Sequence, residues 1–497
     1  MRYVLGLDNG GTMTKAALFE ETGREVAVAS RETPLATPQA GWNERDMEEL
    51  WQANVACIRE ILTVSGVAAE QIAGVGCTGH GKGLYLWGKN GAPAYAGIAS
   101  TDRRAEAVVA RWEADGTAAQ ARKQTLQPVI ACQPVALLRW LKEQKPAVLA
   151  NVQWIFECKD YVRFRLTGCA MAEKTDYSGT SLMDLRTGRF DKALLRLFGL
   201  EELYPCLPPL CNAWDVCGRI TAEAAARTGL REGTPVSGGM FDIDACAVAM
   251  GVTEPEQLCM ITGTWSINEY PAPAPVRADT TTHNSLFCLP DTYLIEESSP
   301  TSAGNLEWYL EACMRGEKRQ AKAEGVRFYD VIDSMVEALP PEESEALFLP
   351  FLYGTNTGSD HAAFVGLSNS YTAAHMLRAV FEGVVFSHRM HLERLLRFRE
   401  APRTIRLAGG AARSKVWVQL FADILQCPIE VVSTHELGAQ GCAMTAAVAA
   451  GIYQTHTEAI GMMLPQTALI QPDRAKAAIY DQKYARYVRL TTCLEGF

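Results

Sequence analysis

The sequence predicts two α/β domains, and three observations lead to this fold class. The chain has 497 residues, more than a single hydrophobic core usually organises. Strand patterns alternate with helix patterns in both halves of the chain, and four of the expected strands end in glycine-containing turns. The alternation begins again near residues 243–255, so we expect one domain over residues 1–245 and a second over residues 246–497.

The composition is typical of a globular protein that does not bind polyanions. Hydrophobic residues make up 48% of the chain, charged residues make up 21%, and the net charge is -10. We therefore expect no nucleic-acid or membrane partner. The absence of a signal peptide, of an apolar run of about 20 residues and of CxxC pairs among the 15 cysteines predicts a cytoplasmic protein with reduced thiols.

The first half is expected to open with a hairpin. Short apolar strands at residues 2–7 and 15–19 flank a glycine turn, and a third strand is expected at 25–29. Asp46 and Glu49 stand in capping-box spacing before an apolar helical face, which predicts a helix over residues 47–63. The later elements expected in this half are strands at 72–78, 152–156 and 235–237 and helices at 103–112, 135–144, 158–166 and 221–228.

The second half repeats the alternation without repeating the sequence. A strand at 259–261 leads into a glycine turn, and a long helical pattern covers residues 372–397. The expected elements that follow are strands at 404–408 and 428–432 and helices at 414–426 and 436–450.

The glycine turns are candidates for a nucleotide site. They lie at residues 8–14, 79–83, 262–264 and 409–412, where glycine would let backbone N–H groups approach a phosphate closely. Taken alone, the first turn fits either a hairpin turn or a phosphate loop, and the last turn fits either a helix entry or a binding loop. Asp8 favours the phosphate loop, since a carboxylate at a strand end can hold Mg²⁺ beside phosphate.

Other nucleotide and metal motifs are weak or absent. Residues 74–79 fit G-x-G-x-x-G, but these glycines lie within a strand pattern and no helix follows; the chain also lacks a P-loop. Cys206, Cys211 and Cys217 are too loosely spaced for a strong metal signal. His388 and His391 are one helical turn apart, a spacing more typical of core or surface histidines than of metal ligands.

Asp242 is the candidate catalytic carboxylate. It follows a strand and two glycines. The alternative is that Asp242 only caps a helix. Asp244 lies two residues further on, where a helix start would point it elsewhere, so a retaining-glycosidase pair is not indicated.

Taken together, these residues resemble the FGGY carbohydrate kinases of the actin, Hsp70 and hexokinase superfamily. The resemblance extends over essentially the whole chain and rests on motifs at residues 6–15, 41–46, 100–104, 159–168, 175–178, 238–242, 262–264, 304–308 and 409–423. Within the family the chain is similar to the L-xylulose kinase group, through residues 41–47, 81–83, 102–104, 137–142, 299–302 and 382–388.

The resemblance implies a fold and a reaction. The fold would be two RNase H-like domains with an interdomain cleft, the first binding sugar and the second binding ATP. The reaction would be Mg²⁺-dependent transfer of the ATP γ-phosphate to a ketopentose hydroxyl, with L-xylulose to L-xylulose 5-phosphate as the first expectation.

The same resemblance assigns residues to these roles. Asp242 would be the base and would also touch sugar and metal, while Asp8 would hold Mg²⁺; Lys15 receives no role. ATP contacts are expected from Gly11, Thr12, Thr14, Gly263, Thr264, Gly304, Gly409, Gly410 and Ser414. Sugar contacts are expected from Gly79, His80, Lys82 and Asp102.

Several alternatives remain open. The loop at residues 79–82 departs from the Gln-Met-His-Gly and Arg-Glu patterns of many relatives, so the acceptor could be another ketose, a sugar acid or a polyol, such as L-ribulose, keto-gulonate or erythritol. A nucleotide-gated, non-catalytic sugar sensor is the alternative from another class. We also expect a homodimer.

Overall fold

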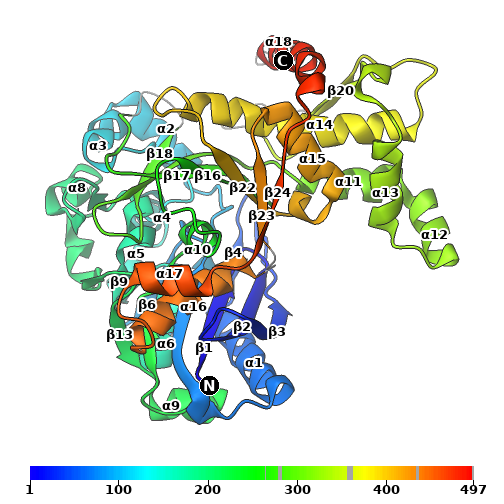
Figure 1. Ribbon diagram of the computed structural model, residues 1–497. Coiled ribbons are helices and arrows are strands. Elements are labelled where there is room, and N and C mark those ends of the chain that lie inside the picture. The colour runs from blue at the N-terminus through cyan, green and yellow to red at the C-terminus, as the bar shows by residue number, and fades with distance from the viewer. Residues whose placement is uncertain (264, 278–281, 355–361, 433–435, 495–497) are drawn as a thin grey trace. The chain divides into compact units, whose positions relative to one another are not determined.

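The computed structural model describes residues 1–263, 265–277, 282–354, 362–432 and 436–494, which form two compact units (Figure 1). The first unit comprises residues 1–253, 272–294 and 436–465, and the second comprises residues 254–271, 295–435 and 466–497. Each unit is therefore assembled from separate stretches of chain, whereas the sequence led us to expect two continuous domains. No helix among the described residues has the length and apolar character needed to span a bilayer.

The sheet of the first unit has the strand order β13-β14-β5-β1-β2-β3, with β15 also paired to β5. β1 and β2 form the predicted hairpin, and β5 lies parallel to β1 with Thr78 opposite Asp8. The strands are β1 (Tyr3–Asn9), β2 (Met13–Glu20), β3 (Glu25–Glu32), β5 (Ile72–Gly79), β13 (Val216–Arg219), β14 (Pro235–Ser237) and β15 (Met240–Phe241).

Helix α1 (Met47–Ser65) confirms the capping signal in the sequence. The Asp46 carboxylate accepts hydrogen bonds from the backbone N–H groups of Glu48 and Glu49, and Gly66 ends the helix at φ 64°. Its apolar face packs against the side of the sheet that carries Leu5, Leu7, Val75 and Cys77. The other elements that bear on the site are β8 (Val152–Phe156), α6 (Cys158–Thr167), β9 (Ala172–Glu173), α7 (Lys174–Tyr177), α10 (Asp242–Ala249) and α16 (Leu437–Ala449).

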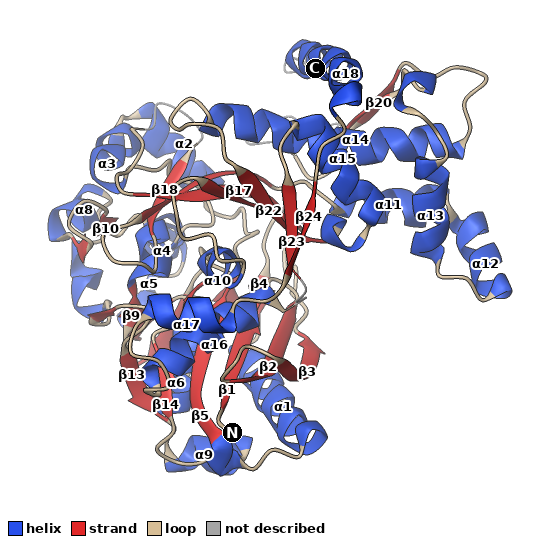
Figure 2. Ribbon diagram, viewed as in Figure 1, coloured by secondary structure: helices blue, strands red, loops and turns tan. Residues whose placement is uncertain are grey.

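Helix α16 covers the opposite face of the sheet, beside β1 and β5 (Figure 2). Strand side chains alternate between faces, so this face carries Gly6, Gly74 and Gly76. A Cβ atom on Gly6 would lie 1.9 Å from the carbonyl oxygen of Ala439, and one on Gly76 would lie 2.0 Å from that of Cys442. The glycines thus allow the helix backbone to lie directly on the strands.

The second unit has the strand order β19-β17-β16-β22-β23-β24. β16 is antiparallel to β17 and parallel to β22, as β1 is to β2 and β5, so the two units share this three-strand arrangement. Its strands are β16 (Gln257–Thr262), β17 (Ser266–Ala272), β19 (Tyr293–Ser299), β22 (Thr404–Gly409), β23 (Ile429–Val432) and β24 (Thr467–Ile470). Its main helices are α11 (Gly304–Cys313), α13 (Phe328–Glu337), α14 (Ala373–Leu395), α15 (Lys415–Leu425) and α18 (Ala477–Leu494).

Candidate active site

Arg45 is hydrogen-bonded to the backbone of the turn between β1 and β2. Its guanidinium donates to the carbonyl oxygen of Gly10 at 3.2 Å and also to that of Gly11. Gly11 and Thr12 remain exposed at the tip. Thr14 is fully buried, and its hydroxyl donates to the Asn9 side chain at 3.2 Å. Gly11 and Thr12 are therefore accessible to a ligand, whereas the Thr14 hydroxyl supports the turn.

Two carboxylates of the first unit repel each other near this turn. Loss of hydration raises the pKa of Asp8 to about 6; Lys15 opposes this effect and Glu436 adds to it. The pKa of Asp242 lies well above its ordinary range, first because of burial and then because of the charges of Asp8 and Asp176. Lys15 itself forms an ion pair with Glu436 at 2.9 Å.

Asp242 is the first residue of α10, one position after Phe241 at the N-cap. A hydrogen bond from the backbone N–H of Ile243 lowers the pKa of Asp242, but burial and neighbouring charges raise it by more, so this contact with the helix start does not account for the carboxylate. Two hard oxygen ligands that repel each other suit a small divalent cation whose remaining ligands are phosphate oxygens and water. In the described stretches of the chain, no group of three or more His, Cys, Asp or Glu side chains is arranged to hold a metal.

The loop after β5 brings a histidine and a lysine close to Phe241. His80 Nε2 lies 2.9 Å from the Tyr85 hydroxyl, and burial, followed by the Arg45 charge, lowers the pKa of His80 to about 3. The Lys82 ammonium lies 5.9 Å from the centre of the Phe241 ring. His80 is thus a neutral group suited to hydrogen bonding with a hydroxyl.

Gly81 allows this loop to approach Asp176. A Cβ atom on Gly81 would lie 2.6 Å from Asp176 Oδ1 and 2.5 Å from the Phe241 ring, so a larger residue would displace both. Gly79 likewise lies against the start of α6, since a Cβ atom on it would be 3.3 Å from the Lys159 backbone nitrogen.

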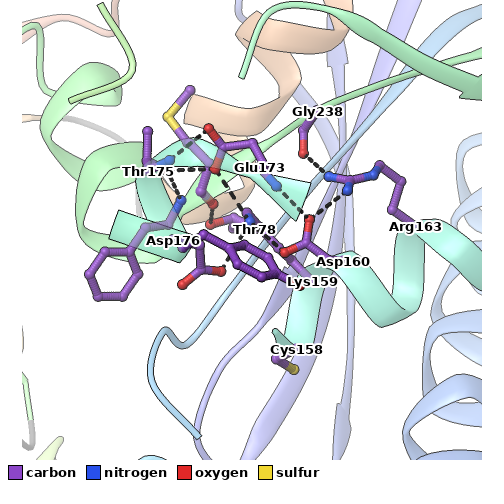
Figure 3. A network of polar contacts seen from close by, with 12 residues as sticks. Thr78, Cys158, Lys159, Asp160, Arg163, Glu173, Thr175, Asp176 and Gly238 are labelled. Carbon is purple, nitrogen blue, oxygen red and sulfur yellow. Dashed lines mark hydrogen bonds and ion pairs between the residues drawn. The ribbon is translucent and has the colours of Figure 1, made fainter. Parts of the chain in front are cut away.

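A buried ionic network lies beside the loop (Figure 3). The Lys159 ammonium lies 3.1 Å from Asp160, 3.3 Å from Glu173 and 3.0 Å from Asp176, and all four side chains are inaccessible to solvent. Burial raises the pKa of Asp176 to about 7 in spite of Lys159. Removing Lys159 would leave Glu173 and Asp176 as buried carboxyl groups without their shared cation.

The network also fixes the start of α10. The Thr175 hydroxyl donates to Glu173 at 2.6 Å and accepts the backbone N–H of Phe241 at 2.9 Å, directly before Asp242. In the sequence, Lys159 and Asp176 stand out only as letters of a family motif, and nothing marks Glu173. No spacing rule could have found this network, because its members come from separate elements.

The Asp102 carboxylate is hydrogen-bonded to neighbouring residues. Its carboxylate accepts hydrogen bonds from the backbone N–H of Asn43 at 2.7 Å and from Arg104 Nη2 at 2.8 Å. The Arg104 guanidinium stacks on Trp42, 4.3 Å from the ring centre, and also pairs with Glu44. This arrangement orients Asp102 rigidly.

Three expected ATP-binding segments of the second unit meet around Thr262. Gly410 N–H donates to the carbonyl oxygen of Thr262 at 2.7 Å, and Gly409 adopts φ 89° beside it. A Cβ atom on Gly410 would lie 3.3 Å from that of Ala303, which directly precedes Gly304 and α11. Gly263 follows Thr262 in the chain, whereas Thr264 lies outside the described residues.

Ser414 and the two helix histidines have structural partners in the same unit. Ser414 is the N-cap of α15; its hydroxyl accepts the backbone N–H of Trp417 at 3.0 Å and donates to Asp333 at 2.7 Å. His388 is a core histidine, 2.7 Å from the Asn268 side chain and 2.9 Å from Ser302. His391 is hydrogen-bonded at 3.0 Å to the Ser299 hydroxyl.

Comparisons with known proteins identify the family of this chain. Residues 3–249 match the N-terminal domain of the FGGY family of carbohydrate kinases, and residues 258–450 match its C-terminal domain. The chain is 38% identical over 500 residues to the L-xylulose/3-keto-L-gulonate kinase of Escherichia coli (strain K12), covering 100% of this chain and 98% of that protein. It is 36% identical to a probable L-xylulose kinase of Pasteurella multocida (strain Pm70), with 100% of both chains covered.

A solved structure shares the whole fold. The xylulose kinase of Rhodospirillum rubrum is 29% identical, with a TM-score of 0.87 over 100% of this chain and 99% of that chain. The prediction made from the motifs is thus confirmed, and the chain belongs to the FGGY family of carbohydrate kinases.

Proposed function

We propose that this kinase transfers the γ-phosphate of ATP to a hydroxyl of a ketopentose, with L-xylulose as the first candidate. The observation that carries the proposal is the pair of mutually repelling carboxylates, Asp8 and Asp242, beside the exposed tip of a glycine turn. The names of the relatives from Escherichia coli and Pasteurella multocida support the choice of sugar.

In this proposal Asp242 accepts the proton of the attacking hydroxyl. A carboxylate whose pKa is raised by burial and by neighbouring charges is a stronger base than an ordinary aspartate. Positioned proton transfer of this kind contributes about 10²- to 10⁴-fold to a rate. His80 and Lys82 would contact sugar hydroxyls, and Asp102, held by Arg104, would support the sugar loop.

ATP would be bound mainly through backbone groups. Gly11 and Thr12 would contact phosphate. The other expected contacts along the nucleotide are Gly263, Thr264, Gly304, Gly409 and Gly410. Ser414, at the start of α15, is the last expected contributor. Asp8 and Asp242 would hold Mg²⁺, which neutralises phosphate charge when bound. Thr14 and Ser414 would act indirectly, because their hydroxyls are engaged within the fold.

The test compares two aspartates of α10. We expect Asp242→Asn to bind ATP and sugar but to lose about 10²-fold or more in kcat, because the amide cannot take the proton. Asp244→Asn is the matched control: Asp244 is buried two residues away, and an amide oxygen there can still accept the backbone N–H of Cys288, which Asp244 accepts at 3.2 Å. ADP release with Mg²⁺-ATP across ketopentoses, polyols and sugar acids is the measurement.

The outcomes separate the competing functions. Near-normal turnover of Asp242→Asn would remove this residue from the mechanism. If the wild type released ADP with none of the acceptors but bound nucleotide in a sugar-dependent way, the non-catalytic sensor would be favoured. The cytoplasmic location and the homodimer remain predictions. Light scattering tests the homodimer, whose mass would be twice the 54.3 kDa of one chain.

A further inference from the structure

Glu157 is a buried carboxylate that no group of the described chain satisfies. It lies between β8 and α6 and is 1% exposed. It occupies the N-cap position of α6 but makes no capping hydrogen bond, and neither Oε1 nor Oε2 has a hydrogen-bond partner. Burying a carboxylate in this way is costly, so the position calls for a ligand that donates hydrogen bonds.

Glu157 lies close to the loop that is expected to bind sugar. The next residue, Cys158, donates to the carbonyl oxygen of Asn9, and His80 N–H donates to the same oxygen at 3.0 Å. The charges of Lys82, Asp102 and Glu157 all act on the thiol of Cys132, whose carbonyl oxygen accepts the N–H of Gly83 at 2.7 Å. Glu157 therefore shares one neighbourhood with the loop at residues 80–83.

Two further buried groups in this neighbourhood each have a polar atom without a hydrogen bond. Asp176 Oδ1, which lies against Gly81, has no hydrogen-bond partner among the described residues, although Oδ2 forms an ion pair with Lys159. His80 Nδ1 has none there either. The pKa of Glu157 lies well above its ordinary range because of burial and then because of Asp176, which shows that the two carboxylates are electrostatically close.

We propose that Glu157, together with Asp176 and His80, binds hydroxyl groups of the acceptor sugar. The inference rests on the proposed kinase function and adds to it residues that would bind the acceptor. A carboxylate oxygen accepts the O–H of a sugar hydroxyl, and a neutral imidazole nitrogen can accept or donate, so a polyol would satisfy all three groups. A site built for hydroxyls rejects analogues that leave its buried polar groups unpaired.

The experiment uses Glu157→Met, which nearly keeps the length of the side chain and removes both oxygens. We expect KM for L-xylulose to rise about tenfold or more, because a sugar hydroxyl loses its hydrogen-bond partner. KM for ATP should stay within about twofold, and the melting temperature should not fall, since a thioether is easier to bury than a carboxyl group without hydrogen bonds. Glu49→Met on the exposed side of α1 is the matched control and should match the wild type in both KM values.

The KM values and the melting temperature together decide the inference. An unchanged KM for L-xylulose, or a parallel rise in KM for ATP with a lower melting temperature, would overturn the inference while leaving the kinase function intact. If the wild type phosphorylates no acceptor, the proposed function fails and the inference fails with it.

Discussion

At the residue scale, two carboxylates are kept in the fold at the expense of stability. Asp8 ends β1 and Asp242 begins α10, and each has a pKa raised by burial and by neighbouring charge. An ionised group in such surroundings destabilises the folded chain relative to the unfolded one. Strain of this kind is typical of functional sites, where a substrate or cation supplies the missing partner.

We expect Asp8→Asn to stabilise the protein in a pH-dependent way. The unfolded carboxyl ionises near its ordinary pKa of 3.8, whereas the folded one has a pKa of about 6, so the wild type loses stability as pH rises between these values. The variant should melt about 2 °C or more above the wild type at pH 8 without Mg²⁺, and close to it at pH 4. Differential scanning calorimetry measures the difference.

The same variant should lose activity at pH 8, where its stability gain is largest. Asp46→Ala serves as a comparison, because Asp46 lies in the first unit but caps α1 and should lose rather than gain stability when changed. An equal shift in melting temperature of Asp8→Asn at both pH values would contradict the assigned pKa of Asp8.

At the element scale, helix α16 both builds the sheet face and positions Asp8. Gly6 and Asp8 point to the same face of β1, and both are covered by α16. A Cβ atom on Gly438 would lie 2.6 Å from Asp8 Oδ2. The first turn of this helix therefore sets the position of the carboxylate. The sequence pattern predicts the helix with nearly its observed bounds but indicates no role for Gly438.

Gly438→Ala should displace the Asp8 carboxylate. We expect kcat to fall about tenfold to 10²-fold, because a small misplacement at a reacting centre is costly, with little change in melting temperature. Gly461→Ala in α17 (His456–Met463) is the control, since nothing lies within 4 Å of its added Cβ atom. The measurement is the kcat of both variants under steady-state conditions. Equal kcat values for the two variants would show that Gly438 does not set the position of Asp8.

At the scale of the whole molecule, the first unit is completed by a distant part of the chain. Residues 436–465 belong to it, although residues 254–271 and 295–435 form most of the second unit. Without α16, the glycine face of β1 and β5 would be exposed. The matches to the two family domains follow the order of the sequence and do not reveal this return of the chain.

A fragment of residues 1–253 should therefore fail to fold on its own. We expect it to aggregate or to be digested rapidly by trypsin, because apolar strand surface that α16 normally buries is left open. Joining residues 272–294 and 436–465, which complete the unit, to its end through flexible linkers should restore a cooperative thermal transition measured by circular dichroism. A soluble, cooperatively folding 1–253 fragment would show that α16 is dispensable for this unit.

The sequence alone predicted most local structure correctly. Asp46 predicted α1, and the apolar runs predicted β1, β2, β5 and β22. These predictions succeeded because capping, turn chemistry and the period of the apolar pattern act between near neighbours in the chain. The family motifs also selected Asp8 and Asp242 as candidates by their local context, and the roles of both remain predictions.

Only the tertiary structure decided which residues meet. Nothing in the sequence indicates that Glu157 is buried without a hydrogen bond, that Lys159 binds three carboxylates, or that Gly438 lies against Asp8. Nor does it show that the Thr14 and Ser414 hydroxyls are engaged within the fold. The physical reason is the same in each case: these contacts join elements far apart in the chain, and burial, charge and close approach arise only where the packed elements bring them together.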